Sequence, residues 1–126
     1  MVKILKKLLK ISQKKNIQVS AFINPTKKMI TLAKILGFDT VEIHTGPLDK
    51  KIIKKNIINK INEMIAYAHS KKLKVNVGHG LNFNNIKYIK KRRYVDTVHV
   101  GHFIISEAIF ISLINTIKTF RALIKK

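Results

Sequence analysis

The sequence predicts an α/β protein in which one helix is followed by four parallel β–α units that form part of a β/α barrel. Segments rich in β-branched and aromatic residues alternate with segments of helical apolar spacing. Each strand segment has one apolar face and one face with polar groups. Parallel strands need right-handed crossovers, and the intervening helices are long enough to supply them.

We expect a single partial-barrel domain over residues 1–126, with a helix at 1–15 and the four β–α units at 16–126. Pro25 ends the first strand, Gly37 is placed as a helix C-cap, and Gly46-Pro47 ends the second strand. Asn82 or Asn84 is a plausible N-cap for the third helix that follows a strand. The expected strands are 17–23, 40–44, 73–77 and 95–100, and the helices after them are 26–36, about 53–68, 82–91 and 104–123.

The alternation within the strands favours a barrel over an open sheet. In the second strand Val41 and Ile43 oppose Thr40, Glu42 and His44. A sheet covered by helices on both faces has strands that are apolar on both faces. We therefore expect the apolar faces to meet the helices, and the polar groups to line the interior near one mouth of a barrel.

The net charge is the unusual feature of the composition. Twenty-six Lys and Arg face six Asp and Glu, which gives a formal charge of +20. Such a charge suits a nucleic-acid or anionic-membrane partner. The Lys pairs are scattered, however, and Arg is scarce, so codon drift in an AT-rich genome explains the charge better than nucleic-acid binding does.

Composition also narrows the class of protein. The absence of Cys excludes disulfides and thiolate metal sites. No apolar run reaches the roughly 18 residues of a membrane span, since Glu107 interrupts the longest one. We expect a cytoplasmic protein with no membrane partner.

Polar residues and glycines gather where each strand ends, which in β/α barrels is the end that carries the active site. Gly78-His79-Gly80 follows the third strand and Gly101-His102 follows the fourth. Glycines let backbone N–H groups approach an anion, and a helix N-terminus after each loop would add partial positive charge. We expect a phosphate site here, although the glycines could serve only as tight turns.

Two side chains are candidates for chemistry. Glu42 points inward from a strand, either as an acid–base or charge-stabilising group or as a structural partner of a neighbouring Lys. His79 can transfer a proton near neutral pH. We expect His44 and His99 to be structural or supporting residues and His69 to lie on the surface of a helix. No spacing matches a metal motif, so no metal is expected.

Four motifs, taken together, resemble the pyridoxine 5'-phosphate synthase family. They are Ile17-Gln18-Val19-Ser20, Glu42-Ile43-His44-Thr45-Gly46, Lys74-Val75-Asn76-Val77-Gly78-His79-Gly80-Leu81 and Gly101-His102-Phe103-Ile104-Ile105. Because that family's chain is about twice as long, the resemblance implies the C-terminal half of a (β/α)8 TIM barrel. It also implies condensation of 1-deoxy-D-xylulose 5-phosphate with 3-amino-2-oxopropyl phosphate, without metal or other cofactor.

The resemblance also implies roles for individual residues. Glu42 is similar to the family's transition-state-stabilising glutamate and His79 to its proton donor. Gly80, Gly101 and His102 are similar to its contacts with the phosphate of the amino ketone. The family's general bases and its arginines for the sugar phosphate belong to the N-terminal half.

Several positions depart from the family pattern. Asn24 stands where Asp is common, Pro47-Leu48 replaces a segment that usually holds a Tyr, His99 stands where an Asn usually precedes the Gly-His pair, and Glu107 stands where Arg is frequent. Three functions stay open: a truncated or split synthase, an inactive remnant of that enzyme, and a basic nucleic-acid-binding module. The expected partners are the two phosphorylated substrates and either further copies of the chain or an N-terminal half.

Overall fold

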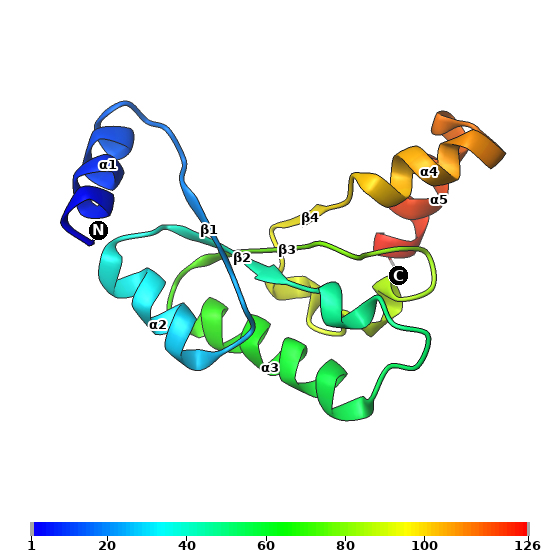
Figure 1. Cartoon of the computed structure of the whole chain (residues 1–126), viewed down its shortest axis with the longest axis horizontal. Coiled ribbons are helices and arrows are strands. Elements are labelled where there is room, and N and C mark those ends of the chain that lie inside the picture. Colours follow the sequence, from blue (N-terminus) through cyan, green and yellow to red (C-terminus); the bar gives the residue numbers. More distant parts are fainter. Residues whose placement is uncertain (1, 126) are drawn as a thin grey trace.

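A computed structural model describes residues 2–125 and contains one parallel sheet with its strands in the order β1-β2-β3-β4 (Figure 1). The elements are α1 (Val2–Lys14), β1 (Ser20–Ile23), α2 (Lys27–Leu36), β2 (Thr40–His44), the 3₁₀ turn η1 (Gly46–Leu48), α3 (Lys55–Ser70), β3 (Lys74–Gly78), the 3₁₀ turns η2 (Ile86–Tyr88) and η3 (Arg92–Tyr94), β4 (Thr97–His99), α4 (His102–Ile111) and α5 (Leu113–Lys125). The predicted α/β fold with four parallel strands is confirmed.

The core lies between the sheet and the two helices α2 and α3, which pack on one of its faces (Figure 1). Val41, Ile43, Val75 and Val77 of the two central strands point to these helices and are fully buried. Burying a side chain of this kind contributes about 1.5–3 kcal/mol. The opposite face carries Glu42 and the exposed side chains of β1 and β4, so the apolar and polar faces are placed as predicted.

The two edge strands are shorter than expected. β1 covers Ser20–Ile23 rather than the predicted 17–23, and β4 covers Thr97–His99 rather than 95–100. Before β1 the chain still runs beside β2, because the Gln18 amide donates a hydrogen bond to the hydroxyl of Thr40 at 2.8 Å. The pairing there is made by a side chain instead of the backbone, so hydrophobicity alone overestimates the strand.

Helix α2 begins and ends where its caps require. The hydroxyl of Thr26 accepts a hydrogen bond from the Met29 N–H. Gly37 takes a φ of 97°, a left-handed conformation that glycine adopts without strain, and its N–H reaches the carbonyls of Ala33 and Lys34. The predicted helix end at Gly37 is confirmed.

The helix predicted at 82–91 is wrong, because the segment forms loops and the two 3₁₀ turns η2 and η3. The side-chain oxygen of Asn82 accepts hydrogen bonds from the N–H groups of Asn84 and Asn85, which makes a turn and not a helix N-cap. Further along, Asn62 of α3 binds the Tyr88 carbonyl and the N–H of Lys90. Side-chain amides thus take the backbone groups that a helix would pair with itself.

The single closing helix predicted at 104–123 is also wrong, because two helices, α4 and α5, meet at Ser112. Ser112 has φ 72° and ψ 153°, which ends α4. Its carbonyl accepts the N–H of Thr116 and so starts α5, and serine is among the residues that favour helix starts. α5 is held in place by Arg92, whose guanidinium donates to the carbonyl of Ile124 at 3.2 Å.

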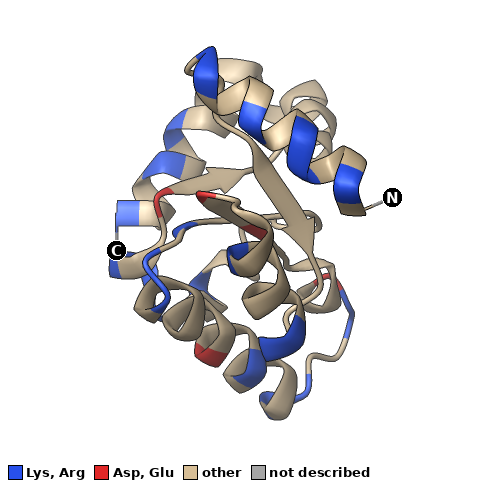
Figure 2. Ribbon diagram, turned by 90° about the vertical axis from the view of Figure 1, so that its left-hand side faces the viewer, with Lys and Arg blue, Asp and Glu red and all other residues tan. Residues whose placement is uncertain are grey.

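Basic side chains are spread over the molecule. Lys and Arg occur along α1, on other helices and in the connecting loops (Figure 2). No helix within residues 2–125 combines the length and the apolarity needed to cross a membrane.

Ser112→Gly should stabilise the chain by about 1 kcal/mol. The backbone of Ser112 lies in a region that is accessible almost only to glycine and costs about 1–3 kcal/mol for other residues. Replacing a serine N-cap by glycine costs only a few tenths of a kcal/mol. The free energy of unfolding in urea measures the change, with Ser106→Gly inside α4 as a control that should lose about 0.5 kcal/mol. A loss at both positions would contradict the assigned backbone of Ser112.

Candidate functional site

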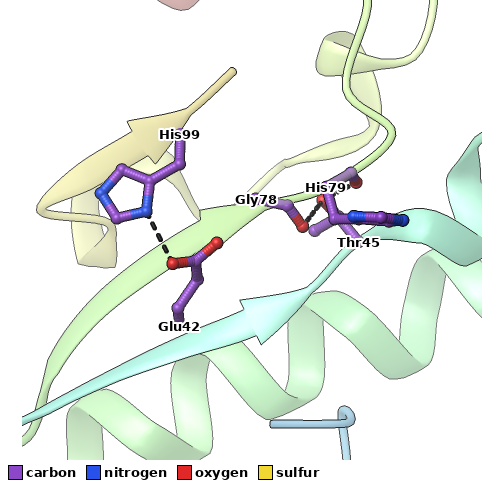
Figure 3. A network of polar contacts seen from close by, with 5 residues as sticks. All are labelled: Glu42, Thr45, Gly78, His79 and His99. Atoms are coloured by element: carbon purple, nitrogen blue, oxygen red, sulfur yellow. Dashed lines mark hydrogen bonds and ion pairs between the residues drawn. The ribbon is translucent and has the colours of Figure 1, made fainter. Parts of the chain in front are cut away.

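The carboxyl ends of β2 and β3 are joined by the backbone and the side chain of Thr45. The backbone N–H of Thr45 donates to the Gly78 carbonyl at 2.8 Å. Its hydroxyl lies 2.6 Å from the Gly78 carbonyl oxygen and 2.8 Å from that of His79 (Figure 3). Thr45 is fully buried, and its N–H and its hydroxyl together supply one donor for each of the two carbonyls. These bonds fix where the loop after β3 leaves the sheet.

That loop begins with two left-handed residues in succession, His79 at φ 73° and Gly80 at φ 69°. A non-glycine residue in this region costs about 1–2 kcal/mol, which the hydrogen bond of the His79 carbonyl to Thr45 offsets. Gly80 is also confined sterically, since a Cβ there would lie 2.8 Å from the Cβ of Asp49 and 3.1 Å from the Cα of Gly46. The glycine thus allows the loop after β3 to rest against the turn after β2.

Asn85 joins the loop after β2 to the loop after β3 by hydrogen bonds. Its amide nitrogen donates to the carbonyls of Gly80 and Leu48, at 2.7 and 3.2 Å. Its side-chain oxygen accepts the N–H of Asn82 at 2.8 Å. Asn85 is buried and its polar side-chain atoms are hydrogen-bonded, so it stabilises the position of both loops at the site.

Glu42 makes a hydrogen bond with His99, at 2.7 Å between Oε2 and Nδ1 (Figure 3). The two residues stand on β2 and β4, and Gly78 of β3 lies between them in register. A Cβ at Gly78 would overlap Oε1 of Glu42. The structural partner that the sequence suggested for Glu42, a Lys, is therefore wrong, because it is a histidine two strands away.

Three rings gather at the mouth of β1, β2 and β3. The rings of His44 and His79 are 4.8 Å apart between centroids, and Phe22 meets His44 edge-on at 5.3 Å. Burial, and to a lesser extent the neighbouring His79, lower the pKa of His44 below its usual 6.5. His44 is therefore neutral at pH 7, and supports His79 without adding charge beside it. His69, by contrast, lies exposed on α3, as predicted.

The five predicted site residues line one pocket of about 960 Å³ at the carboxyl end of the sheet. These residues are Glu42, His79, Gly80, Gly101 and His102, and they come from β2, from the loop after β3 and from the start of α4. A helix N-terminus was predicted after each glycine loop, and the one expected after β3 is wrong because 3₁₀ turns follow there. α4 does begin at His102, so its first N–H groups are without intrahelical partners beside the pocket.

Comparison with known proteins identifies the family. The family described as pyridoxal phosphate biosynthesis protein PdxJ matches residues 1–126. The chain belongs to this family. A pyridoxine 5'-phosphate synthase of Chlorobium phaeobacteroides is 38% identical over 97% of the chain and 53% of the relative. Those of Prochlorococcus marinus and Thermodesulfovibrio yellowstonii are 37% and 35% identical, over 98% and 97% of the chain and 52% and 51% of the relative.

The chain spans about half the length of the curated relatives it matches. Together with four parallel strands in sequential order, this agrees with half of a TIM barrel. Between residues 2 and 125, no three His, Asp or Glu side chains lie close enough together to hold a metal ion.

The sequence did not indicate four further residues that shape or line the pocket of this PdxJ-family chain. Thr45 and Asn85 act through backbone carbonyls that are distant in sequence. Asp49 and Ser106 also line the pocket, but they come from a turn and from a helix and not from the strand ends. For Thr45 there was a signal, since a threonine between His44 and Gly46 places a hydroxyl at the end of a strand.

Thr45→Val should lower the free energy of unfolding by about 1–3 kcal/mol, because the His79 carbonyl loses the hydroxyl as its donor while the side chain keeps its shape. The Gly78 carbonyl keeps the Thr45 N–H as its donor. Thr40→Val is a matched control, since Thr40 is also buried on β2 but its hydroxyl bonds only the flexible Gln18 side chain. Urea unfolding of both variants is the measurement. Equal losses would show that the hydroxyl of Thr45 has no special role at the strand ends.

Proposed function

We propose that these residues form the C-terminal half of a pyridoxine 5'-phosphate synthase, as a truncated or split chain. The proposed reaction condenses 1-deoxy-D-xylulose 5-phosphate with 3-amino-2-oxopropyl phosphate to give pyridoxine 5'-phosphate, with release of water and inorganic phosphate. The observation that carries the proposal is the single pocket that brings Glu42 and His79 together with two Gly-His strand ends in a PdxJ-family chain.

The phosphate of 3-amino-2-oxopropyl phosphate is proposed to bind between Gly80, Gly101 and His102. A Cβ at Gly101 would have no atom within 4 Å, so the space beside this residue is open to a ligand. The first N–H groups of α4 supply donors and partial positive charge, which favour a phosphate. The exposed imidazole of His102 can add a further hydrogen bond.

His79 is proposed as the proton donor and Glu42 as the group that stabilises charge in the transition state. Loss of water requires a proton to reach the leaving oxygen, and an imidazole can deliver it near neutral pH. The ring of His79 is held at the pocket by the left-handed backbone and by its contact with His44. The carboxylate of Glu42 enters the same pocket from β2, where it can stabilise developing positive charge.

The remaining groups are proposed to come from four preceding β–α units. The sugar phosphate and the general bases would bind on that side, as the resemblance implies. The surface of α4 is suited to such packing, since Ile105, Ile109 and Phe110 are 64%, 79% and 81% exposed. The outer edges of β1 and β4 offer backbone groups for further parallel strands. Together these surfaces would close the barrel over the pocket.

The 126-residue chain alone should form no detectable pyridoxine 5'-phosphate, because its pocket holds groups for one phosphate and one proton donor. Adding the first half of the Chlorobium relative as a separate chain should restore turnover. His79→Ala should then lower this turnover by about 10²-fold or more. His69→Ala, on the surface of α3, is the control and should leave turnover unchanged. Product formation is followed by chromatography.

Two results would contradict the proposal. Product from the 126-residue chain alone would show that the site is not shared with another half. A complex of the two halves that forms on gel filtration but has no activity would indicate an inactive remnant.

A further inference from the structure

The contact between Glu42 and His99 crosses a whole strand. The register pairs Glu42 with Asn76 on β3 and His99 with Gly78, so the two side chains meet above the glycine. The Cβ of His99 would lie 3.1 Å from a Cβ built on Gly78, and Oε1 of Glu42 would overlap it. The absence of a side chain at Gly78 is therefore what allows the 2.7 Å bond to form (Figure 3).

The direction of this bond follows from the chemistry of its partners. An ionised carboxylate only accepts hydrogen bonds, so Nδ1 of His99 is the donor. The side chain of Glu42 is 20% exposed and that of His99 is 45% exposed, so the carboxylate is the more enclosed of the two. Among the described residues the His99 ring is the one hydrogen-bond partner found for the Glu42 side chain.

We propose that His99 is a positioning residue that holds the carboxylate of Glu42 at the pocket through Nδ1–H, across Gly78. The inference deepens the proposed function and rests on it for its effect on turnover. A charge-assisted hydrogen bond fixes one oxygen of the carboxylate and leaves Oε1 above Gly78. The role belongs to one ring nitrogen, because Nδ1 makes the hydrogen bond to Glu42.

Two amide substitutions at His99 distinguish the role of Nδ1 from that of Nε2. The side-chain nitrogen of Asn stands as many bonds from Cα as Nδ1 does, so His99→Asn keeps a donor to Glu42. The amide group of Gln is one bond longer, so His99→Gln moves the donor away from that place. In the chain combined with an N-terminal half, His99→Ala and His99→Gln should lower kcat about tenfold or more with little change in KM. His99→Asn should restore kcat to within about threefold of the unsubstituted enzyme.

The bond itself can be tested without turnover, by ¹⁵N NMR of histidine-labelled chain. At a pH where the free imidazole is neutral, Nδ1 of His99 should carry a proton, whereas free histidine prefers the proton on Nε2. Glu42→Ala should return His99 to the Nε2–H form. Gly78→Ala should do the same, because the added methyl displaces the carboxylate. His69 in the same spectra reports whether each variant is folded, through its stacking on Tyr94 at 4.4 Å.

The turnover measurements and the NMR spectra test the positioning role of His99 and the proposed function separately. An unprotonated Nδ1 in the unsubstituted chain would overturn the positioning role whatever the activity. If Nδ1 is protonated but His99→Asn is as slow as His99→Ala, the proposed role is also overturned. Absence of turnover in every combination, with Nδ1 protonated, would instead refute the proposed function and leave the Glu42–His99 bond established.

Discussion

The site depends most on the hydrogen bonds of Thr45 to the carbonyls of Gly78 and His79. Regular backbone pairing between β2 and β3 ends at this point, and a carbonyl left buried without a partner would be costly. The N–H and the hydroxyl of Thr45 together satisfy the Gly78 and His79 carbonyls, which permits the left-handed turn through His79 and Gly80. That turn places the imidazole of His79 beside His44 and brings Gly80 against the loop after β2. The hydrogen bonds of one threonine at a strand end therefore help to determine the shape of the pocket.

The sequence was sufficient for the strands, for their parallel order and for five of the residues that line the pocket. The faces of β2 and β3 could be assigned because alternation follows from strand geometry, and Val41, Val75 and Glu42 lie where it places them. The helix at 82–91 could not be excluded, because Asn62 is distant in sequence and pairs with that loop only after folding. The break at Ser112 was missed for a different reason, since the segment is apolar on both sides of it.

The distribution of apolar surface explains how a PdxJ-family chain can have a well-packed core and an open site at once. α2 and α3 cover the apolar face of the sheet and bury its central strands. α4 has no buried residue although seven of its ten residues are apolar, which is unusual for a helix that faces water. The same open side of the sheet carries Glu42, His99 and the exposed Phe22. The core and the pocket thus lie on opposite faces of the sheet. Helix α4, which borders the pocket, leaves large apolar side chains exposed.

We propose that the ends of β3 and β4 bind phosphate in spite of the excess charge elsewhere. Titration of ¹⁵N-labelled chain with inorganic phosphate, against chloride at equal ionic strength, tests it most directly. The largest amide shifts should occur at Gly80, Gly101 and His102, since these residues line the pocket. Shifts of similar size on the lysine-bearing helices α1 and α3, with none at these three residues, would contradict it and indicate non-specific attraction to the charge of +20.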